Sequence, residues 1–105
     1  MYIVVLVTAK DKRQAKAIAK KLLKEKLIAC ANIVENVQSL FWWDGKIDGS
    51  KEALLLLKTK RGLFGKLAKA VKALHTYDVP EIIALPIIKG YNPYLRWIGK
   101  STKDK

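Results

Sequence analysis

The chain has 105 residues, of which half are apolar and 29% are charged, a composition that predicts one folded domain and excludes a disordered chain. It contains no apolar run long enough to cross a membrane, and its single cysteine, Cys30, excludes an intrachain disulfide and fits a reducing cytosol. The net charge of +12 would attract polyanions, but lysines at helical spacing, such as Lys16, Lys20 and Lys24, favour solvated helix faces over a nucleic-acid site.

The first predicted elements are a strand and a helix. The apolar run over residues 2–8 indicates a central strand, covered on both faces, rather than a signal peptide. Asp11 stands three residues before Gln14, a spacing that is typical of a helix cap with a partner that reaches back. Apolar residues then recur at helical spacing, so we predict a helix over residues 12–26.

A long β-hairpin is predicted next. Its first arm covers residues 27–43, with an interruption at residues 35–36, and its return strand covers residues 51–59. Two turn signals, Asp44-Gly45 and Asp48-Gly49, lie between the arms. We place the turn at Asp48-Gly49 and a bulge at Gly45, because this register sets the aromatic residues of the first arm opposite leucines of the second.

Three more elements complete the chain, in the order helix, strand, helix: residues 62–74, 82–88 and 94–99. Pro86 indicates that the strand lies at a sheet edge or contains a bulge. The Asn92-Pro93 pair predicts the start of the last helix. The order β-α-β-β-α-β predicts an α+β, ferredoxin-like fold, an antiparallel sheet with two helices on one face. We expect residues 1–105 to form this single domain, with a frayed tail over residues 100–105.

The hairpin carries an unusual density of aromatic residues, with Trp42 and Trp43 side by side. Arms of about eight residues would reach some 26 Å, at roughly 3.3 Å per residue, and would expose an apolar edge if the chain stayed alone. Closed self-association would bury this edge. The alternative is that the aromatic residues cover the open face of the sheet within one chain.

Five motifs occur in order along the chain: Ala29-Cys30-Ala31-Asn32, Trp42-Trp43-Asp44-Gly45-Lys46-Ile47, Leu57-Lys58-Thr59, His75-x-Tyr77-x-x-Pro80-Glu81-Ile82 and Tyr94-Leu95-x-Trp97. Through these motifs, from about Ile3 to Trp97, the chain resembles the CutA family of divalent-cation tolerance proteins. The resemblance implies a tight homotrimer that exchanges long hairpins between neighbours. It also implies a cytosolic protein, without enzymatic activity or a required cofactor, that is linked to copper and other divalent metal ions.

The ligands proposed for copper-linked members of this family are a first-strand cysteine and an adjacent pair of histidines. Val7 and Leu74 replace two of these three residues here, so that only His75 remains. His75 is a candidate metal ligand, or else a loop histidine that hydrogen-bonds at a helix C-terminus. Cys30 is a candidate soft ligand for Cu(I), or else a small buried residue.

A second candidate site combines Lys58, Tyr77 and Glu81. A cation, a phenol and a carboxylate on one rim would form a pocket with a polar floor, which Trp42 or Trp43 of a neighbouring copy would close. The alternative is an ion pair at a subunit seam, without a ligand. Asp78 and Glu81 are also candidate weak ligands for hard divalent cations, or clamps for their own loop.

These observations favour a homotrimer that binds or responds to divalent metal ions, acts without catalysis and contacts neither membrane nor nucleic acid. The second hypothesis is a small-ligand or polyanion-binding module, because the architecture is similar to that of PII-type signalling trimers. The third is a small hydrolase built on Lys58, Tyr77 and Glu81, although enzyme motifs and zinc-like spacings are absent from the sequence. Few Asn, Gln, Cys and Met beside many lysines would suit a heat-adapted protein.

Overall fold

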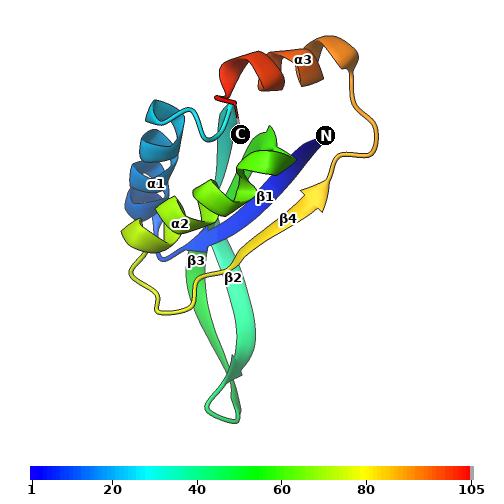
Figure 1. The fold of residues 1–105 in the computed structure, drawn as a ribbon. Coiled ribbons are helices and arrows are strands. Elements are labelled where there is room, and N and C mark those ends of the chain that lie inside the picture. Colours follow the sequence, from blue (N-terminus) through cyan, green and yellow to red (C-terminus); the bar gives the residue numbers. More distant parts are fainter. Residues whose placement is uncertain (105) are drawn as a thin grey trace.

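The structure is a computed structural model that describes residues 1–104. Its elements follow in the order β1 (Tyr2–Ala9), α1 (Lys12–Lys24), β2 (Cys30–Trp43), β3 (Lys46–Lys60), a 3₁₀ turn (Arg61–Leu63), α2 (Phe64–Leu74), β4 (Ile82–Pro86) and α3 (Asn92–Ser101). The strands form one antiparallel sheet in the order β2-β3-β1-β4, and α1 and α2 lie on the same side of it (Figure 1). The predicted α+β, ferredoxin-like class is confirmed.

The core lies between the sheet and the two helices. β1 is a central strand as predicted, but the expectation that it is covered on both faces is wrong within one protomer: only alternate residues are buried, because the helices pack on one side of the sheet. Val5 and Val7 of this face contact a cluster that includes Ile18 and Leu22 of α1 and Leu67 of α2. Asp11 caps α1 as predicted: its Oδ1 accepts the backbone N–H of Gln14 at 2.8 Å, and the Gln14 amide oxygen accepts the N–H of residue 10 at 2.9 Å.

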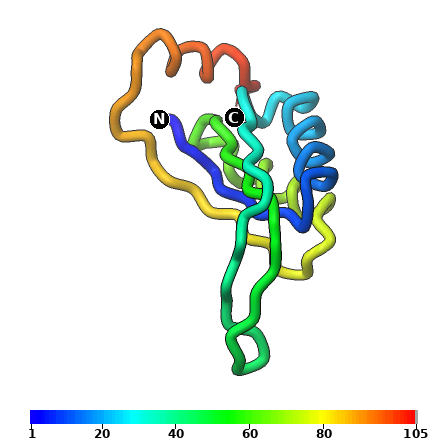
Figure 2. Tube along the Cα trace, turned by 180° about the vertical axis from the view of Figure 1, so that it is seen from behind, coloured from blue at the N-terminus to red at the C-terminus, as the bar shows by residue number. Residues whose placement is uncertain are grey.

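The opposite face of the sheet has no helix over it (Figure 2). It exposes large apolar side chains: Val34 of β2 and Ile83 and Leu85 of β4 are 47%, 51% and 52% exposed. β4 is an edge strand that ends at Pro86, in agreement with the position predicted for this proline. We call this surface the open face. It leaves an apolar surface in water that a single protomer does not bury.

The hairpin of β2 and β3 projects from the body as a long arm (Figure 1), which gives the protomer an extent of 44 × 26 × 22 Å. The interruption predicted at residues 35–36 is confirmed, because the register shifts between Val34 and Val37 and Asn36 has φ 58°. This bulge lies where the arm leaves the body, and it marks the point at which β2 bends away from the sheet.

The predicted turn of the hairpin is wrong. The turn lies at Asp44-Gly45, where both residues have positive φ, 50° and 74°, as a two-residue turn that matches strand twist requires. Trp42 therefore faces Ile47, and Leu40 faces Gly49. Leucine partners within the chain, which the predicted register gave to the aromatic residues, are therefore not formed. The local preference of Asp-Gly for this turn prevails, and the aromatic residues remain exposed.

The C-terminal segment is better anchored than predicted. The fraying expected over residues 100–105 does not apply to residues 100–103, because α3 continues to Ser101 and Thr102 is buried with its hydroxyl on the Ile98 carbonyl at 3.0 Å. The backbone N–H of Lys103 also bonds to the Lys26 carbonyl at 2.9 Å. Lys105 lies outside the described residues. Helix α1 ends two residues earlier than predicted, and Lys26 follows it with φ 57°.

Candidate functional site

A cleft of about 970 Å³ lies where the hairpin meets the loop between α2 and β4. Three segments supply its lining: the end of β1, both arms of the hairpin and the loop after His75. The lining residues are Thr8, Gln38, Ser39, Leu40, Phe41, Trp43, Asp48, Ser50, Glu52, Tyr77, Asp78, Val79 and Glu81. Its volume is that of a site for a small molecule rather than for a single ion.

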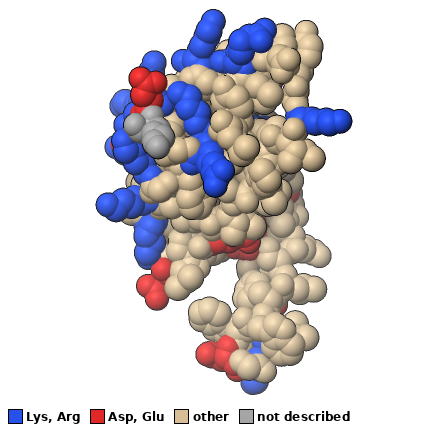
Figure 3. Space-filling view, turned by 45° about the vertical axis from the view of Figure 1, so that its right-hand side comes forward, with Lys and Arg blue, Asp and Glu red and all other residues tan. Residues whose placement is uncertain are grey.

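The cleft is acidic, although the chain as a whole is basic. Its lining holds four of the nine acidic residues, Asp48, Glu52, Asp78 and Glu81, and none of the 21 lysines and arginines. Figure 3 shows acidic side chains where the arm leaves the body, whereas lysines and arginines gather over the body. The two salt bridges found among residues 1–104 involve Glu35 and Glu25, so none neutralises a carboxylate of the cleft.

Glu52 and Tyr77 form the floor of the cleft. The Tyr77 hydroxyl donates a hydrogen bond of 2.7 Å to Oε2 of Glu52, a residue that is only 7% exposed. Burial raises the pKa of Tyr77 to about 12, and the Glu52 carboxylate adds to this shift because it accepts a hydrogen bond from the neutral phenol and repels a phenolate. The bond ties the loop after α2 to the base of the arm.

The Tyr77 phenol is expected to titrate at about 12, above its ordinary value of 10.0, and Glu52→Gln is expected to lower that pKa toward 10.0. Because the folded state favours the neutral phenol, this contribution to stability is complete below about pH 10 and is lost as the pH rises through about 12. Tyrosinate absorbance, recorded against Tyr77→Phe, measures the pKa. A Tyr77 pKa near 10.0 in the unmodified protein would contradict the bond to Glu52.

His75 holds the start of the same loop. Its Nε2 lies 2.7 Å from the Thr8 carbonyl oxygen, and its Nδ1 accepts the backbone N–H of Tyr77 at 3.1 Å. The neutral ring thus carries its proton on Nε2, and both nitrogens have protein partners. His75 directly follows α2 and is 8% exposed. The alternative offered by the sequence was a loop histidine that hydrogen-bonds at a helix C-terminus, but the ring bonds to β1 and to Tyr77 instead.

Cys30 lies in another part of the molecule. It is half-buried at the start of β2, opposite Lys58, which in turn faces Val4 of β1. The Lys58 Nζ lies 3.9 Å from the Cys30 Sγ and donates to Asn32 Oδ1. Burial raises the pKa of Tyr94, and the adjacent Cys30 adds to that shift.

The two predicted metal ligands therefore do not meet within one protomer. His75 contacts Thr8 of β1, whereas Cys30 pairs with Lys58 of β3, whose partner in β1 is Val4, four residues from Thr8. That separation is about 13 Å at 3.3 Å per residue. Among residues 1–104 the structure contains no cluster of three or more His, Cys, Asp or Glu residues that could hold a metal ion.

The predicted group of Lys58, Tyr77 and Glu81 is divided in the same way. Tyr77, Glu81 and Trp43 line the cleft, but Lys58 lies beside Cys30 and Trp42 is not part of the lining. Sequence reasoning missed most of the lining that the hairpin supplies, including Phe41, Asp48, Ser50 and Glu52. A turn at Asp44-Gly45 would have revealed them, because it sets these residues on one face of the two arms.

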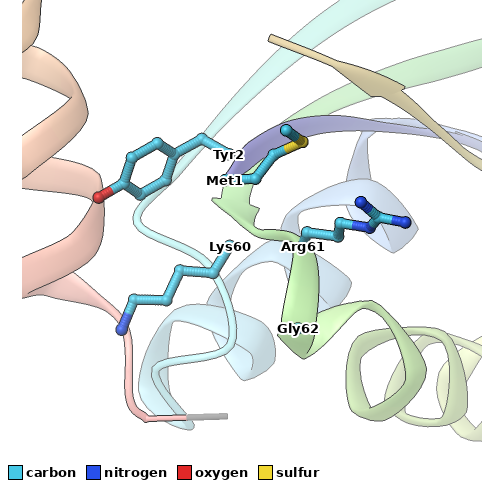
Figure 4. A pocket seen from close by; sticks show the side chains of 5 residues that line it. All are labelled: Met1, Tyr2, Lys60, Arg61 and Gly62. Atoms are coloured by element: carbon cyan, nitrogen blue, oxygen red, sulfur yellow. The ribbon is translucent and has the colours of Figure 1, made fainter.

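A second hollow, of about 500 Å³, is lined by Met1, Tyr2, Lys60, Arg61 and Gly62. Figure 4 shows that the Lys60 and Arg61 side chains point in opposite directions. The Lys60 Nζ donates to the backbone carbonyls of Thr102 and Lys103, at 3.3 and 3.1 Å. The two cations do not converge on a common point, so this hollow lacks the geometry of an anion site.

Comparisons with known proteins all identify relatives from one family. The family model for the CutA1 divalent ion tolerance protein matches residues 3–101. A divalent-cation tolerance protein CutA from Thermus thermophilus is 48% identical over 99 residues, which cover 94% of this chain and 96% of that protein. The solved structure of that organism's Cut A1 has a TM-score of 0.96 at 47% identity, over 98% of this chain and all of that one.

A chloroplastic CutA 1 from Oryza sativa is 47% identical over 102 residues. The match covers 97% of this chain but only 58% of the plant protein. The chain thus spans little more than half the length of this relative. No helix within the described part of the chain is long and apolar enough to cross a membrane.

Proposed function

Because the chain belongs to the CutA1 family of divalent ion tolerance proteins, we propose that it serves tolerance of divalent metal ions, copper among them, as a homotrimer in the cytosol. The observation that carries this proposal is the long arm with its exposed apolar side chains. Trp42 and Ile47 are 73% and 69% exposed, and neither lines the cleft. They lie on the side of the hairpin opposite to Phe41 and Asp48, and we call them the outer face of the hairpin.

The outer face and the open face of the sheet support a ring of protomers. Each surface exposes apolar side chains, and the two surfaces lie on different parts of the same chain. Contact between two different surfaces of identical protomers is heterologous, and it closes into a ring when the rotation permits. In the proposed trimer, the outer face of each hairpin is buried by a neighbour. We propose three protomers per ring because of the resemblance to the CutA family.

We propose binding rather than catalysis for this protein. The hydrolase hypothesis required Lys58, Tyr77 and Glu81 in one site, and the structure divides them. The hypothesis of a small-ligand site draws support from the acidic cleft, whereas the basic hollow at Lys60 and Arg61 gives the polyanion hypothesis none.

Copper binding tests the metal part of the proposal. We propose Cys30 as the soft ligand, since its thiol is half-buried and bonded only by weak contacts of 3.9 and 4.0 Å. Cys30→Ser is expected to lower the affinity for Cu(I) by about tenfold or more, because a hydroxyl is a poor ligand for this ion. Competition titration with a Cu(I) chelator measures the affinity. Equal affinities of the variant and the unmodified protein would remove Cys30 as a ligand.

His75→Ala is expected to leave Cu(I) affinity unchanged and to lower stability instead. The substitution leaves the Thr8 carbonyl and the Tyr77 N–H without their partners, at a cost of about 1–3 kcal/mol in the free energy of unfolding. Urea unfolding and the same chelator titration, performed on one preparation, separate the two effects. A loss of Cu(I) binding at unchanged stability would instead make His75 a ligand.

A further inference from the structure

We propose that the protein binds the phosphate backbone of a nucleic-acid duplex, without reading its sequence, on the side of α1 and α2 that points away from the sheet. We call this surface the helical face. Because α1 buries Ile18 and Leu22 and α2 buries Leu67, the helical face lies on the opposite side of each helix. It exposes Arg13, Lys16, Lys20, Lys24, Lys66 and Lys69. The inference goes beyond the role in metal tolerance.

The proposed assembly leaves the helical face free. Helices α1 and α2 lie together on one side of the sheet, and the open face is the other side (Figures 1 and 2). The proposed ring uses the open face and the outer face of the hairpin, and neither surface contains a residue of α1 or α2. A ligand can therefore reach the helical face both in a single protomer and in the ring.

The cations of the helical face form no ion pairs among residues 1–104, because the two salt bridges found there involve Lys12 and Lys21 instead. Helices α1 and α2 contain nine of the 21 lysines and arginines and none of the nine acidic residues. In the sequence the two lysine rows are separate, which favoured solvated surfaces, but the structure places the two helices in contact and joins the rows. A continuous surface of positive charge attracts a polyanion.

This arrangement of charge lowers the stability of the helices. Lys16, Lys20 and Lys24 are four residues apart, so that like charges are neighbours along α1 and repel one another. Arg13 lies in the first turn of α1, where the partial positive charge of the helix N-terminus disfavours a cation. Neither helix has an acidic residue in its first turn. Helix stability therefore does not account for the charge, whereas a bound polyanion would relieve the repulsion.

The dimensions of the helical face suit a duplex. Arg13 to Lys24 spans about 17 Å along α1, at 1.5 Å per residue, and a duplex carries about ten phosphate charges over that length, at one per 1.7 Å. Lys66 and Lys69 of α2 form a second row about 10 Å away, a typical distance between packed helices. Two rows of flexible cations can thus contact several phosphates of a duplex at once.

A single strand or a membrane fits the helical face less well. Helix α1 contains no aromatic residue, and Phe64, the only one in α2, packs against the core, so unpaired bases find no ring to stack on. Membrane-surface helices insert a continuous apolar face into the lipid, whereas the apolar faces of α1 and α2 are buried against the sheet. The helical face therefore offers contacts to phosphates alone, which predicts binding that is independent of base sequence.

Fluorescence anisotropy of a labelled DNA duplex of mixed sequence tests the inference. We expect saturable binding whose affinity falls as salt rises, because phosphate contacts release counterions. Lys16→Gln combined with Lys20→Gln is expected to weaken binding about tenfold at low salt and to reduce the slope of log affinity against log salt by about two. Lys16→Arg combined with Lys20→Arg should keep the affinity, because arginine also binds phosphate. Neither variant should be less stable in urea, since both positions are exposed.

The matched control is Lys89→Gln combined with Arg96→Gln, which removes the same charge from exposed cations outside α1 and α2. Its affinity for the duplex should stay within about twofold of the original. Equal weakening in the two Gln variants would overturn the inference, because binding would then follow net charge alone. Binding to the single strand or to phosphatidylserine vesicles, but not to the duplex, would overturn it as well. A monomeric protein that binds the duplex would refute the proposed trimer and leave the inference intact.

Discussion

Glutamate in place of both Trp42 and Ile47 is expected to separate the assembly into single protomers. The two side chains face each other across the arm and are 73% and 69% exposed in one protomer, so the proposed trimer must bury them. A carboxylate buried in an apolar contact without a partner costs several kcal/mol, and the loss of a central Trp alone typically costs 2 kcal/mol or more. We therefore expect association to weaken by more than about a hundredfold.

Light scattering after size exclusion, at micromolar concentration, measures the effect. The mass of the variant should fall to that of one protomer, 11.9 kDa, while its circular dichroism stays that of the folded chain. Asp44→Asn serves as the control, because it changes the same arm without altering the outer face. An assembly of unchanged mass in the double variant would show that the outer face is not the contact between protomers.

Leu57→Ala is expected to cause the largest loss of stability. Leu57 is fully buried in β3, between Val5 of β1 and Ala31 of β2, where the sheet packs against the helices. Truncation leaves a cavity that a sheet fixed by neighbours on both sides cannot close, so the free energy of unfolding should fall by about 2–5 kcal/mol.

Urea unfolding at a fixed protomer concentration gives this value, since assembly makes apparent stability depend on concentration. The control is Leu23→Ala on α1, where the side chain is 42% exposed and the expected loss is below about 1 kcal/mol. Similar losses in the two variants would contradict the assignment of Leu57 to the core.

The fold was predictable because its signals are local or periodic. The continuous apolar run of β1, the helical spacing after Asp11 and the proline in β4 each lead to an element that the structure contains. The turn of the hairpin was not predicted, because we chose the register that gives Phe41 and Trp43 leucine partners within one chain. A sequence does not show whether an apolar residue packs within its own chain or stays exposed on its surface.

The candidate site was predicted only in part. Tyr77 and Glu81 share the cleft with Trp43 as expected, since a short loop keeps them near the base of the arm. Lys58 does not join them, because it lies six residues beyond Glu52 along β3, about 20 Å at the rise of a strand. The error in the turn also concealed the alternate residues Asp48, Ser50 and Glu52, which depend on the register of the two arms.

The mass of the unmodified protein in solution tests the central claim most directly, that copies of this chain bury their hairpin arms in one another. Native mass spectrometry or light scattering at micromolar concentration should give three times the protomer mass of 11.9 kDa. A particle of 11.9 kDa under these conditions would contradict the account, because the apolar outer face of the hairpin would then remain in water.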